Sequence, residues 1–292
     1  MRLCRFNDNR LGVVLGDTVI DVSPALEKLP RYGYPLPRYD LLIANLAELV
    51  PIIKFLVPIG QTHQLSQVSL LSPVANPGKV VAAPVNYGAH LLEARNDPQI
   101  HRNKQIERIQ KVGLFLKATS SLVGPSTGVT LRFPERRNDH EIELVAIIGK
   151  TAANISADDA LSHVAGYSIG LDMTLRGEEE RSLRKSLDSY TVVGPWLVTR
   201  EDIQAPGSLE LLLTVNDQIR QKANTRDLIL SIPQLIAYAS QFYTLFPGDL
   251  LFTGTPEGVG PVGSSDTMVA TIEGIGSMTV QVAGQKDSGA RV

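Results

Sequence analysis

The sequence predicts a mixed, β-rich α+β protein in which a small N-terminal domain precedes a larger one. Short β-branched runs bounded by turn residues dominate the chain after residue 79, whereas helical periodicity is confined to a few segments. Residues 71–78 contain two prolines and a glycine and separate the two regions like a linker. At roughly 100–200 residues per domain, the 292-residue chain has room for both.

The N-terminal domain, which we assign to residues 1–75, begins with strands and continues with a helix. Residues 10–16 and 18–22 are β-branched runs separated by a turn signal, a pattern typical of a hairpin. Residues 41–57 form the most apolar stretch of the chain. Polar residues and a proline interrupt this stretch, and it is too short to span a bilayer, so we expect a buried helix.

The larger domain, residues 76–283, is predicted to consist mainly of strands and turns. The expected strands are residues 79–83, 114–117, 141–149, 166–175, 209–215, 250–253 and 278–282. The expected helices are residues 90–110, 157–164 and 232–242. Residues 284–292 are polar and are predicted to form a tail.

Composition excludes several classes of partner. The chain has 28 basic and 30 acidic residues, a formal charge of −2, so it lacks the basic surface expected for nucleic acid or an anionic membrane. A small molecule is therefore the expected partner.

The single cysteine, Cys4, cannot form an internal disulfide and is predicted to be a small apolar residue of an N-terminal strand. Because residues 1–9 also lack the apolar core of a signal peptide, we expect a cytoplasmic protein.

Two glutamates stand close together at the head of an otherwise apolar predicted strand. Side chains alternate between the faces of a strand, so Glu141 and Glu143 project from the same side. Buried carboxylates this close require a metal ion, a basic side chain or a shared proton, unless this end of the strand is solvated. Asp172 adds a third carboxylate, and the small residues Ser168 and Gly170 on its face are expected to leave room for a ligand. Three oxygen donors favour Mg²⁺ or Mn²⁺, with Ca²⁺ as an alternative.

A second group of polar residues lies on a predicted helix. His90 and Glu93 are three residues apart and therefore meet on one helix face. A carboxylate that orients a histidine makes a general base for water, although such pairs also occur on helix surfaces. Further along, Arg176, Arg181 and Arg184 are suited to hold an acidic substrate; the alternative is a solvated charged face.

In this order, these segments resemble the fumarylacetoacetate hydrolase superfamily over residues 79–282. The motifs that carry the resemblance are Asn86-Tyr-x-x-His90, Leu114-Phe-Leu-Lys117, His140-Glu-x-Glu143, Gly166-Tyr with Asp172, Lys185-Ser-x-Asp188, Gly194-Pro-Trp196, Asn216-x-x-x-Arg-Gln221 and Pro247-Gly-Asp249 followed by Thr253-Gly-Thr-Pro-x-Gly-Val-Gly260. The resemblance implies a mixed β-sandwich roll with a small N-terminal domain, usually a homodimer.

The resemblance also implies roles for individual residues. Glu141, Glu143 and Asp172 match ligands of Mg²⁺ or Mn²⁺. The expected catalytic residues are His90 and Glu93, which match a water-activating dyad on a lid helix, and Lys185. The expected substrate-binding residues are Asn86, Tyr87, Lys117, Arg176, Glu179 and Thr255.

Glu179 departs from the family pattern. Many members have a glutamine there that donates to a substrate oxygen, and an ionised carboxylate cannot donate. Either the local register shifts, or Glu179 is protonated, or it pairs with Arg181 or Arg184, or the substrate differs at that oxygen. The long polar segment after the dyad predicts an extended lid whose basic residues face an acidic substrate. These basic residues are Arg95, His101, Arg102 and Lys104.

Together these features predict a divalent-metal-dependent hydrolase that cleaves a C–C bond in a 2,4-dioxo acid. The expected substrate is a small anionic 2-oxo acid, acylpyruvate or fumarylacetoacetate-like, from the catabolism of aromatic compounds. An isomerase or decarboxylase of the 2-hydroxyhepta-2,4-diene-1,7-dioate or oxaloacetate type is the alternative within the family. A relative that binds metal or ligand without activity is the alternative from another class.

Overall fold

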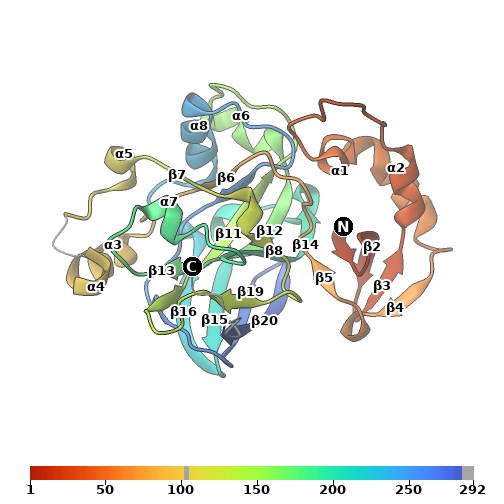
Figure 1. Cartoon of the computed structure of the whole chain (residues 1–292). Helices are drawn as coiled ribbons and strands as arrows, with labels where there is room; N and C mark the ends of the chain where they lie inside the picture. The colour runs from red at the N-terminus through yellow and green to blue at the C-terminus, as the bar shows by residue number, and fades with distance from the viewer. Residues whose placement is uncertain (102–104, 285–292) are drawn as a thin grey trace.

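The computed structural model describes residues 1–101 and 105–284, and in them strands outnumber helices, as predicted. Within these residues, twelve strands form one sheet, five form a second and three form a third, and none of the sheets closes on itself. The largest sheet runs from the N-terminal strands through the middle of the molecule (Figure 1). The predicted mixed α+β, strand-rich architecture is confirmed. The predicted tail lies outside the described residues, except for Gly284.

The N-terminal strands extend the largest sheet. They are β1 (Arg2–Phe6), β2 (Arg10–Leu15), β3 (Thr18–Asp21) and β4 (Thr62–Gln64). The predicted hairpin is β2 and β3, joined by a two-residue loop in which Gly16 has a φ of +59°, a value that suits glycine. β1 pairs with β14 (Thr191–Thr199) of the larger region and so makes the sheet continuous. The domain boundary after residue 75 stays a prediction.

The helix predicted over residues 41–57 is divided into α1 (Leu41–Ala44) and α2 (Leu46–Leu56). Asn45 lies at the junction, where its side-chain amide donates to the Leu41 carbonyl at 2.8 Å. An asparagine that bonds the backbone in this way competes with the helical hydrogen bonds, which explains the break.

The strands that carry the carboxylates lie at the centre of the largest sheet. β11 (Ile142–Ile148) pairs with β12 (Val164–Asp172) and β17 (Leu250–Phe252), and β12 pairs with β14 (Thr191–Thr199). Every residue of β11 and β14 is buried, so both faces of these strands are covered. The other strands of the largest sheet are β5 (Leu70–Leu71), β6 (Val80–Ala82), β7 (Phe115–Lys117) and β8 (Leu122–Val123).

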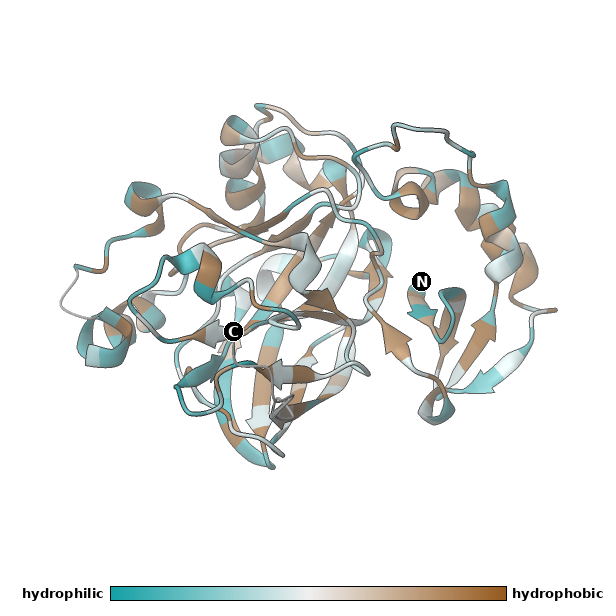
Figure 2. Cartoon of the chain, viewed as in Figure 1, coloured by the Kyte–Doolittle hydropathy of each residue, from teal (hydrophilic) through white to brown (hydrophobic). Residues whose placement is uncertain are grey.

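Two hydrophobic cores lie on opposite faces of the central strands. The even-numbered residues of β11 enter one core, whereas Val145 and Ile147 enter the other, which they share with α1 and α2. Figure 2 shows brown and pale segments along the central strands, whereas α4 (Pro98–His101) is mostly teal. Burial of each such aliphatic side chain stabilises the fold by about 1.5–3 kcal/mol. Because side chains alternate along a strand, Glu143 lies on the face of Val145 and Ile147.

The two smaller sheets flank the central one. The five-stranded sheet contains β9 (Val129–Leu131), β15 (Glu210–Val215), β16 (Gln218–Asn224), β19 (Thr267–Ile272) and β20 (Gly276–Gly284). The three-stranded sheet contains β10 (Asn138–His140), β13 (Thr174–Leu175) and β18 (Gly260–Pro261). β10 and β13 directly adjoin the carboxylate-bearing segments of β11 and β12 in the chain.

One predicted helix is wrong. Residues 90–110 contain three short helices, α3 (Gly88–Asn96), α4 (Pro98–His101) and α5 (Ile109–Val112), with residues 102–104 outside the described part. Pro98 ends α3 because the residue before a proline is driven out of helical geometry, and Asp97 is extended.

The other helices follow the prediction more closely. α8 (Ile232–Phe242) has the predicted bounds, and α6 (Ala157–Ala160) continues as a 3-10 turn to His163. α7 (Arg181–Arg184) is short. No helix in the described ranges is both long and apolar enough to cross a membrane.

Candidate active site

The three predicted metal ligands converge at one end of the central strands. Glu141 precedes β11, Glu143 lies in it and Asp172 ends β12. The register sets Glu143 opposite Gly170, and the Asp172 N–H donates to the Glu141 carbonyl at 2.9 Å. One oxygen of each carboxylate lies within 4.8 Å of the others, and all three side chains are buried. Glu143 Oε2 also accepts a hydrogen bond from the Gly254 N–H at 2.6 Å.

The small residues on this face do not leave room for a ligand, so that expectation is wrong. A Cβ at Gly170 would lie 2.4 Å from the Phe252 ring and 2.6 Å from Val145. The Ser168 hydroxyl donates to two backbone carbonyls of β14. Gly170 and Ser168 therefore contribute to packing within the sheet. The cavity beside the carboxylates is lined by other residues.

Two buried lysines lie among the carboxylates. Lys185 Nζ donates to Glu141 Oε2 at 2.7 Å and to Asp172 Oδ2 at 2.6 Å. Lys117 donates to the other Asp172 oxygen, and the Thr174 hydroxyl donates to Glu141 Oε1 at 3.1 Å. Buried charges are tolerated when they are paired and hydrogen-bonded, which explains why these groups occur together.

Burial and neighbouring charges act differently on the two glutamates. Burial raises the pKa of Glu141, but Lys185 and Arg176 outweigh this effect and lower that pKa to about 2. Burial and the negative charge of Asp172 raise the pKa of Glu143 well above its usual range. Three buried carboxylates with converging oxygens form a donor set that fits a hard divalent cation.

The predicted dyad lies on α3. His90 Nδ1 and Glu93 Oε2 are 2.7 Å apart, and Glu93 Oε1 accepts from the Gly258 N–H at 2.8 Å. Because Nδ1 is engaged, Nε2 is the nitrogen that can take a proton. His90 is buried and lines the same cavity as Glu141 and Glu143. The structure thus sets an oriented histidine beside the carboxylates.

A small cavity of about 70 Å³ joins the dyad to the carboxylates. The predicted site residues on its wall are His90, Glu141, Glu143, Arg176, Lys185 and Thr255. Arg181 and Arg184 also line the wall, from α7, and Ile100 and Ile106 contribute apolar surface. The Arg181 guanidinium lies 5.6 Å from the centre of the Phe115 ring, and burial lowers its pKa. These arginines suit an acidic ligand.

Three more of the predicted site residues, Glu93, Lys117 and Asp172, do not line the cavity but bond to residues that do, or to one another. Glu93 contacts His90, and Lys117 contacts Asp172, which in turn binds Lys185. These residues orient or neutralise the groups on the wall.

Asn86 fixes the chain ahead of α3, and the described residues that line the cavity do not include Asn86 or Tyr87, so their expected role in substrate binding stays a prediction. The Asn86 amide donates to the carbonyls of Leu230 and Thr253 at 3.0 and 2.8 Å, and its carbonyl accepts from the Leu230 N–H at 2.8 Å. The Tyr87 hydroxyl is buried and has no hydrogen-bond partner among the described residues. All polar atoms of the Asn86 side chain are therefore used to fix this segment.

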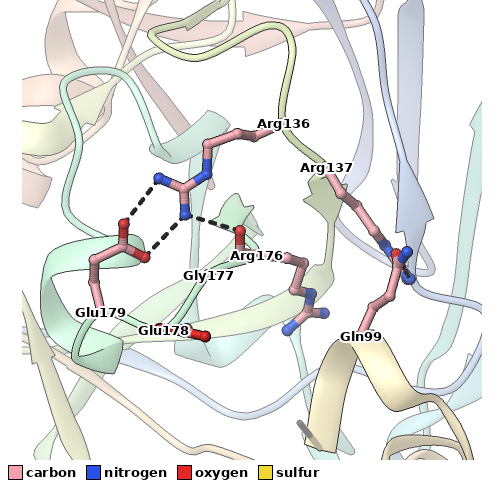
Figure 3. A pocket seen from close by; sticks show the side chains of 7 residues that line it. All are labelled: Gln99, Arg136, Arg137, Arg176, Gly177, Glu178 and Glu179. Carbon is pink, nitrogen blue, oxygen red and sulfur yellow. Dashed lines mark hydrogen bonds and ion pairs between the residues drawn. The ribbon is translucent and has the colours of Figure 1, made fainter.

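Glu179 lies in a neighbouring pocket, where Arg136 binds it (Figure 3). Both hydrogen bonds from the Arg136 guanidinium measure 2.9 Å, and they lower the pKa of Glu179 to about 2. Glu179 is therefore ionised, and Arg136 binds its carboxylate, while Arg184 Nε donates to its backbone carbonyl at 2.8 Å. Its expected role in substrate binding is not supported, because it lies outside the cavity that His90 lines.

Arg176 lines both pockets. Its Nε donates to Asp139 Oδ2 at 2.7 Å, and its Nη2 donates to Glu141 Oε1 at 3.1 Å. Asp139 is completely buried and also accepts from Arg137 Nε at 2.7 Å. The expected substrate-facing arginine is thus held in place by two carboxylates.

The basic residues expected on the lid are only partly described. Arg95 is exposed, and its Nε donates to the Ile106 carbonyl at 3.0 Å, so it ties the segment to itself instead of facing the carboxylates. His101 is half-buried at the end of α4. Arg102 and Lys104 lie outside the described residues.

Gln221, on β16, is a residue that the sequence analysis did not assign to the site. Its Oε1 accepts from the Ile142 N–H at 3.0 Å and lies 3.2 Å from His140 Nδ1. Its Nε2 donates to the Thr255 hydroxyl at 2.8 Å and the Pro256 carbonyl at 2.9 Å. Gln221 therefore connects the start of β11 to the segment that presents Thr255. The family motif that ends at Gln221 was the available signal.

Known proteins resemble this chain along nearly its whole length. The family model described as the fumarylacetoacetate hydrolase C-terminal domain matches residues 79–283. The maleylpyruvate hydrolase of Aquipseudomonas alcaligenes is 56% identical over 284 residues, which cover 97% of this chain and 99% of that protein.

Two solved structures add information about ligands. Maleylpyruvate hydrolase from Sphingobium sp. SYK-6, in complex with manganese(II) ion and pyruvate, matches with a TM-score of 0.83 and 42% identity, over 98% of this chain and 100% of that one. Fumarylpyruvate hydrolase from Pseudomonas aeruginosa, in complex with Mn²⁺ and pyruvate, matches with a TM-score of 0.62 and 32% identity, over 73% and 92%.

Proposed function

The chain belongs to the fumarylacetoacetate hydrolase family, and on that premise we propose that it is a divalent-metal-dependent hydrolase of an acylpyruvate. The reaction would cleave a C–C bond of a 2,4-dioxo acid during the breakdown of aromatic compounds. The observation that carries the proposal is the convergence of three buried carboxylates and the His90–Glu93 dyad on one cavity with arginines on its wall.

We assign metal binding to Glu141, Glu143 and Asp172. Mn²⁺ and Mg²⁺ both suit an all-carboxylate donor set, and Mn²⁺ is the ion in two of the similar structures. A bound ion would act as a Lewis acid on the oxygens of a 2-oxo acid and would orient the substrate.

His90 is the proposed general base. Its Nε2 would take a proton from water while Glu93 holds Nδ1 and stabilises the resulting imidazolium. The hydroxide would add to the distal carbonyl of the substrate, and the C–C bond would break with its electron pair moving onto the pyruvate fragment as an enolate. Lys185 supplies positive charge where this anion forms, and protonation of the enolate then gives pyruvate.

The arginines of the cavity wall favour an acyl group that carries its own carboxylate. Maleylpyruvate, named for two of the similar proteins, is such a dicarboxylate, whereas acetylpyruvate is not. Arg181 is suited to the second carboxylate, because it lies on the cavity wall beside the Phe115 ring and is absent from the ion pairs found among the described residues. We therefore propose maleylpyruvate, or an isomer of it, as the substrate.

We also propose that the protein is a cytoplasmic homodimer. The family resemblance supports the dimer, and the single, buried Cys4 supports a reducing compartment. Light scattering on the purified protein would measure the oligomeric state, and a fluorescent fusion at native expression level would show the location.

The substrate assignment is tested with Mn²⁺-loaded protein and a panel of maleylpyruvate, acetylpyruvate, oxaloacetate and a hydroxydienedioate, with products identified by mass. We expect maleylpyruvate to gain one water and yield maleate and pyruvate. Loss of CO₂ would indicate a decarboxylase, and an isomer of unchanged mass would indicate an isomerase. Glu141→Ala should lose both metal and turnover; if the unaltered protein binds Mn²⁺ but turns over nothing, it is a binding protein.

A further inference from the structure

Arg137 links the helix of the dyad to the carboxylates through a chain of ion pairs. Its Nη1 donates to Asp97 Oδ2 at 3.0 Å, and its Nε donates to Asp139 Oδ1 at 2.7 Å. The other Asp139 oxygen accepts from Arg176, which also binds Glu141. The resulting ionic chain, Asp97–Arg137–Asp139–Arg176–Glu141, runs from the end of α3 to a carboxylate of the proposed metal site.

The middle of this ionic chain is rigidly held. Asp139 is completely buried, and a buried carboxylate shared by two guanidinium groups is costly to disturb. Arg137 also donates from Nη1 to Gln99 Oε1 on α4 at 2.8 Å. Figure 3 shows Arg137 meeting Gln99, whereas the neighbouring Arg136 points toward Glu179. Arg137 therefore contacts Asp97 at the C-terminal end of α3 and Gln99 on α4. The hydrogen bonds of Arg136 within the described residues go to Glu179 and to the Arg176 carbonyl instead.

α3 depends on such contacts because apolar packing holds it only in part. It has nine residues, fewer than the roughly 12–15 that an isolated helix needs to be stable in water. Its buried side chains are His90, Leu91 and Ala94. Leu92 is 61% exposed. Glu93 is held by the Gly258 N–H, and at the C-terminal end Arg95 bonds the Ile106 carbonyl while Arg137 connects Asp97 to the rest of the protein.

We propose that Arg137 is a positioning residue that fixes the C-terminal end of α3 and thereby sets His90 in place relative to Glu141. The inference rests on the proposed function only in taking His90 as the base. An arginine is needed because its planar fork can bind Asp97, Gln99 and Asp139 together, whereas a lysine ammonium has no such geometry.

Hydrogen exchange of the backbone amides in residues 89–101 tests this anchoring without any substrate. Arg137→Met should raise their exchange rates by about tenfold. In the unaltered protein, local opening of α3 must break the ion pairs of Arg137, and in the variant this cost is absent. Arg136→Met is the matched control from the same pocket and should change these rates by less than about twofold. Asp97→Asn weakens the same Arg137–Asp97 ion pair. The double variant Arg137→Met, Asp97→Asn should therefore exchange at nearly the same rates as Arg137→Met alone.

Activity and metal affinity provide independent readouts. With maleylpyruvate, Arg137→Met should lower kcat by about tenfold through misplacement of the base, with KM changed less than about threefold. Mn²⁺ affinity without substrate, measured by electron paramagnetic resonance, should stay within about twofold. Arg137→Lys should recover part of kcat.

Equal exchange rates in Arg137→Met and Arg136→Met would overturn the proposal. A loss of Mn²⁺ affinity as large as the loss of kcat would also overturn it, since Arg137 would then act on the metal site. Failure of the unaltered protein to hydrolyse acylpyruvates would refute the proposed function but would leave the exchange result interpretable. If Arg137→Met does not fold, Asp97→Asn at the half-buried end of the ionic chain carries the same exchange test.

Discussion

Replacing Gln221 with leucine should destabilise the protein by about 2–6 kcal/mol. The change removes the acceptor of the Ile142 N–H and the donor to the Pro256 carbonyl, and both residues are buried. A buried group without a partner costs about 1–3 kcal/mol, so the two backbone groups account for about 2–6 kcal/mol. His140, whose Nδ1 lies 3.2 Å from Gln221 Oε1, also loses this contact. The Thr255 hydroxyl can rotate to another partner, so it adds nothing to this sum. Leucine resembles glutamine in size, so loss of hydrogen bonds rather than a cavity accounts for the effect.

The measurement is urea-induced unfolding without metal, followed by the fluorescence of the single tryptophan and by circular dichroism. Coincident transitions by the two probes would establish two-state behaviour. Gln218→Leu is the matched control, because Gln218 is an exposed residue of the same strand and its replacement should change stability by less than about 0.5 kcal/mol. A loss below about 1 kcal/mol for Gln221→Leu, relative to this control, would refute the assigned hydrogen bonds.

Four further changes test the site and the core. His90→Ala should lower kcat for maleylpyruvate by about 10²-fold while Mn²⁺ still binds; undiminished cleavage in steady-state assays would show that another group is the base. Mn²⁺ at roughly 100 times its Kd should raise the free energy of unfolding by about 2.7 kcal/mol, and Glu143→Gln should abolish this gain in thermal scans. Arg181→Met should raise KM for maleylpyruvate by about tenfold or more yet change that for acetylpyruvate less than about twofold; equal effects would contradict the assigned contact. Burial raises the pKa of the Cys4 thiol to about 12, so iodoacetamide near pH 8, below that pKa, should label the protein by mass spectrometry only after unfolding.

The sequence predicts the site best where the chemistry follows a local period. Glu141 and Glu143 share a strand face because side chains alternate, and His90 and Glu93 share a helix face because they are three residues apart. The bounds of α8 follow from the helical periodicity of residues 232–242, and in the structure Ser231 and Gln234 form a capping box at its start. In each case a few neighbouring residues determine the outcome.

Predictions fail where residues distant in the chain decide the structure. Glu179 binds Arg136, which lies 43 residues earlier, and nothing in the local pattern favours it over Arg184. Gly170 is small because Phe252 fills its space, and that packing appears only when β17 joins β11. The division of residues 90–110 is different, because the signal that ends α3, Pro98, is local, whereas the helical periodicity on both sides of it favours one longer helix.

The pairing of β1 with β14 has a consequence for any attempt to shorten the protein. Arg2 and Leu3 pair with Val198 and Leu197, so the N-terminal region covers this end of β14, whereas β8 covers Thr191 and Val192 at the other end. A fragment that starts at residue 76 would expose the edge of β14 around Leu197 and Val198, a buried and largely apolar stretch, and such edges recruit strands from other molecules. The matched family region, although it contains the entire candidate site, would therefore aggregate as a fragment unless β14 received a replacement neighbour or a charged residue on that edge.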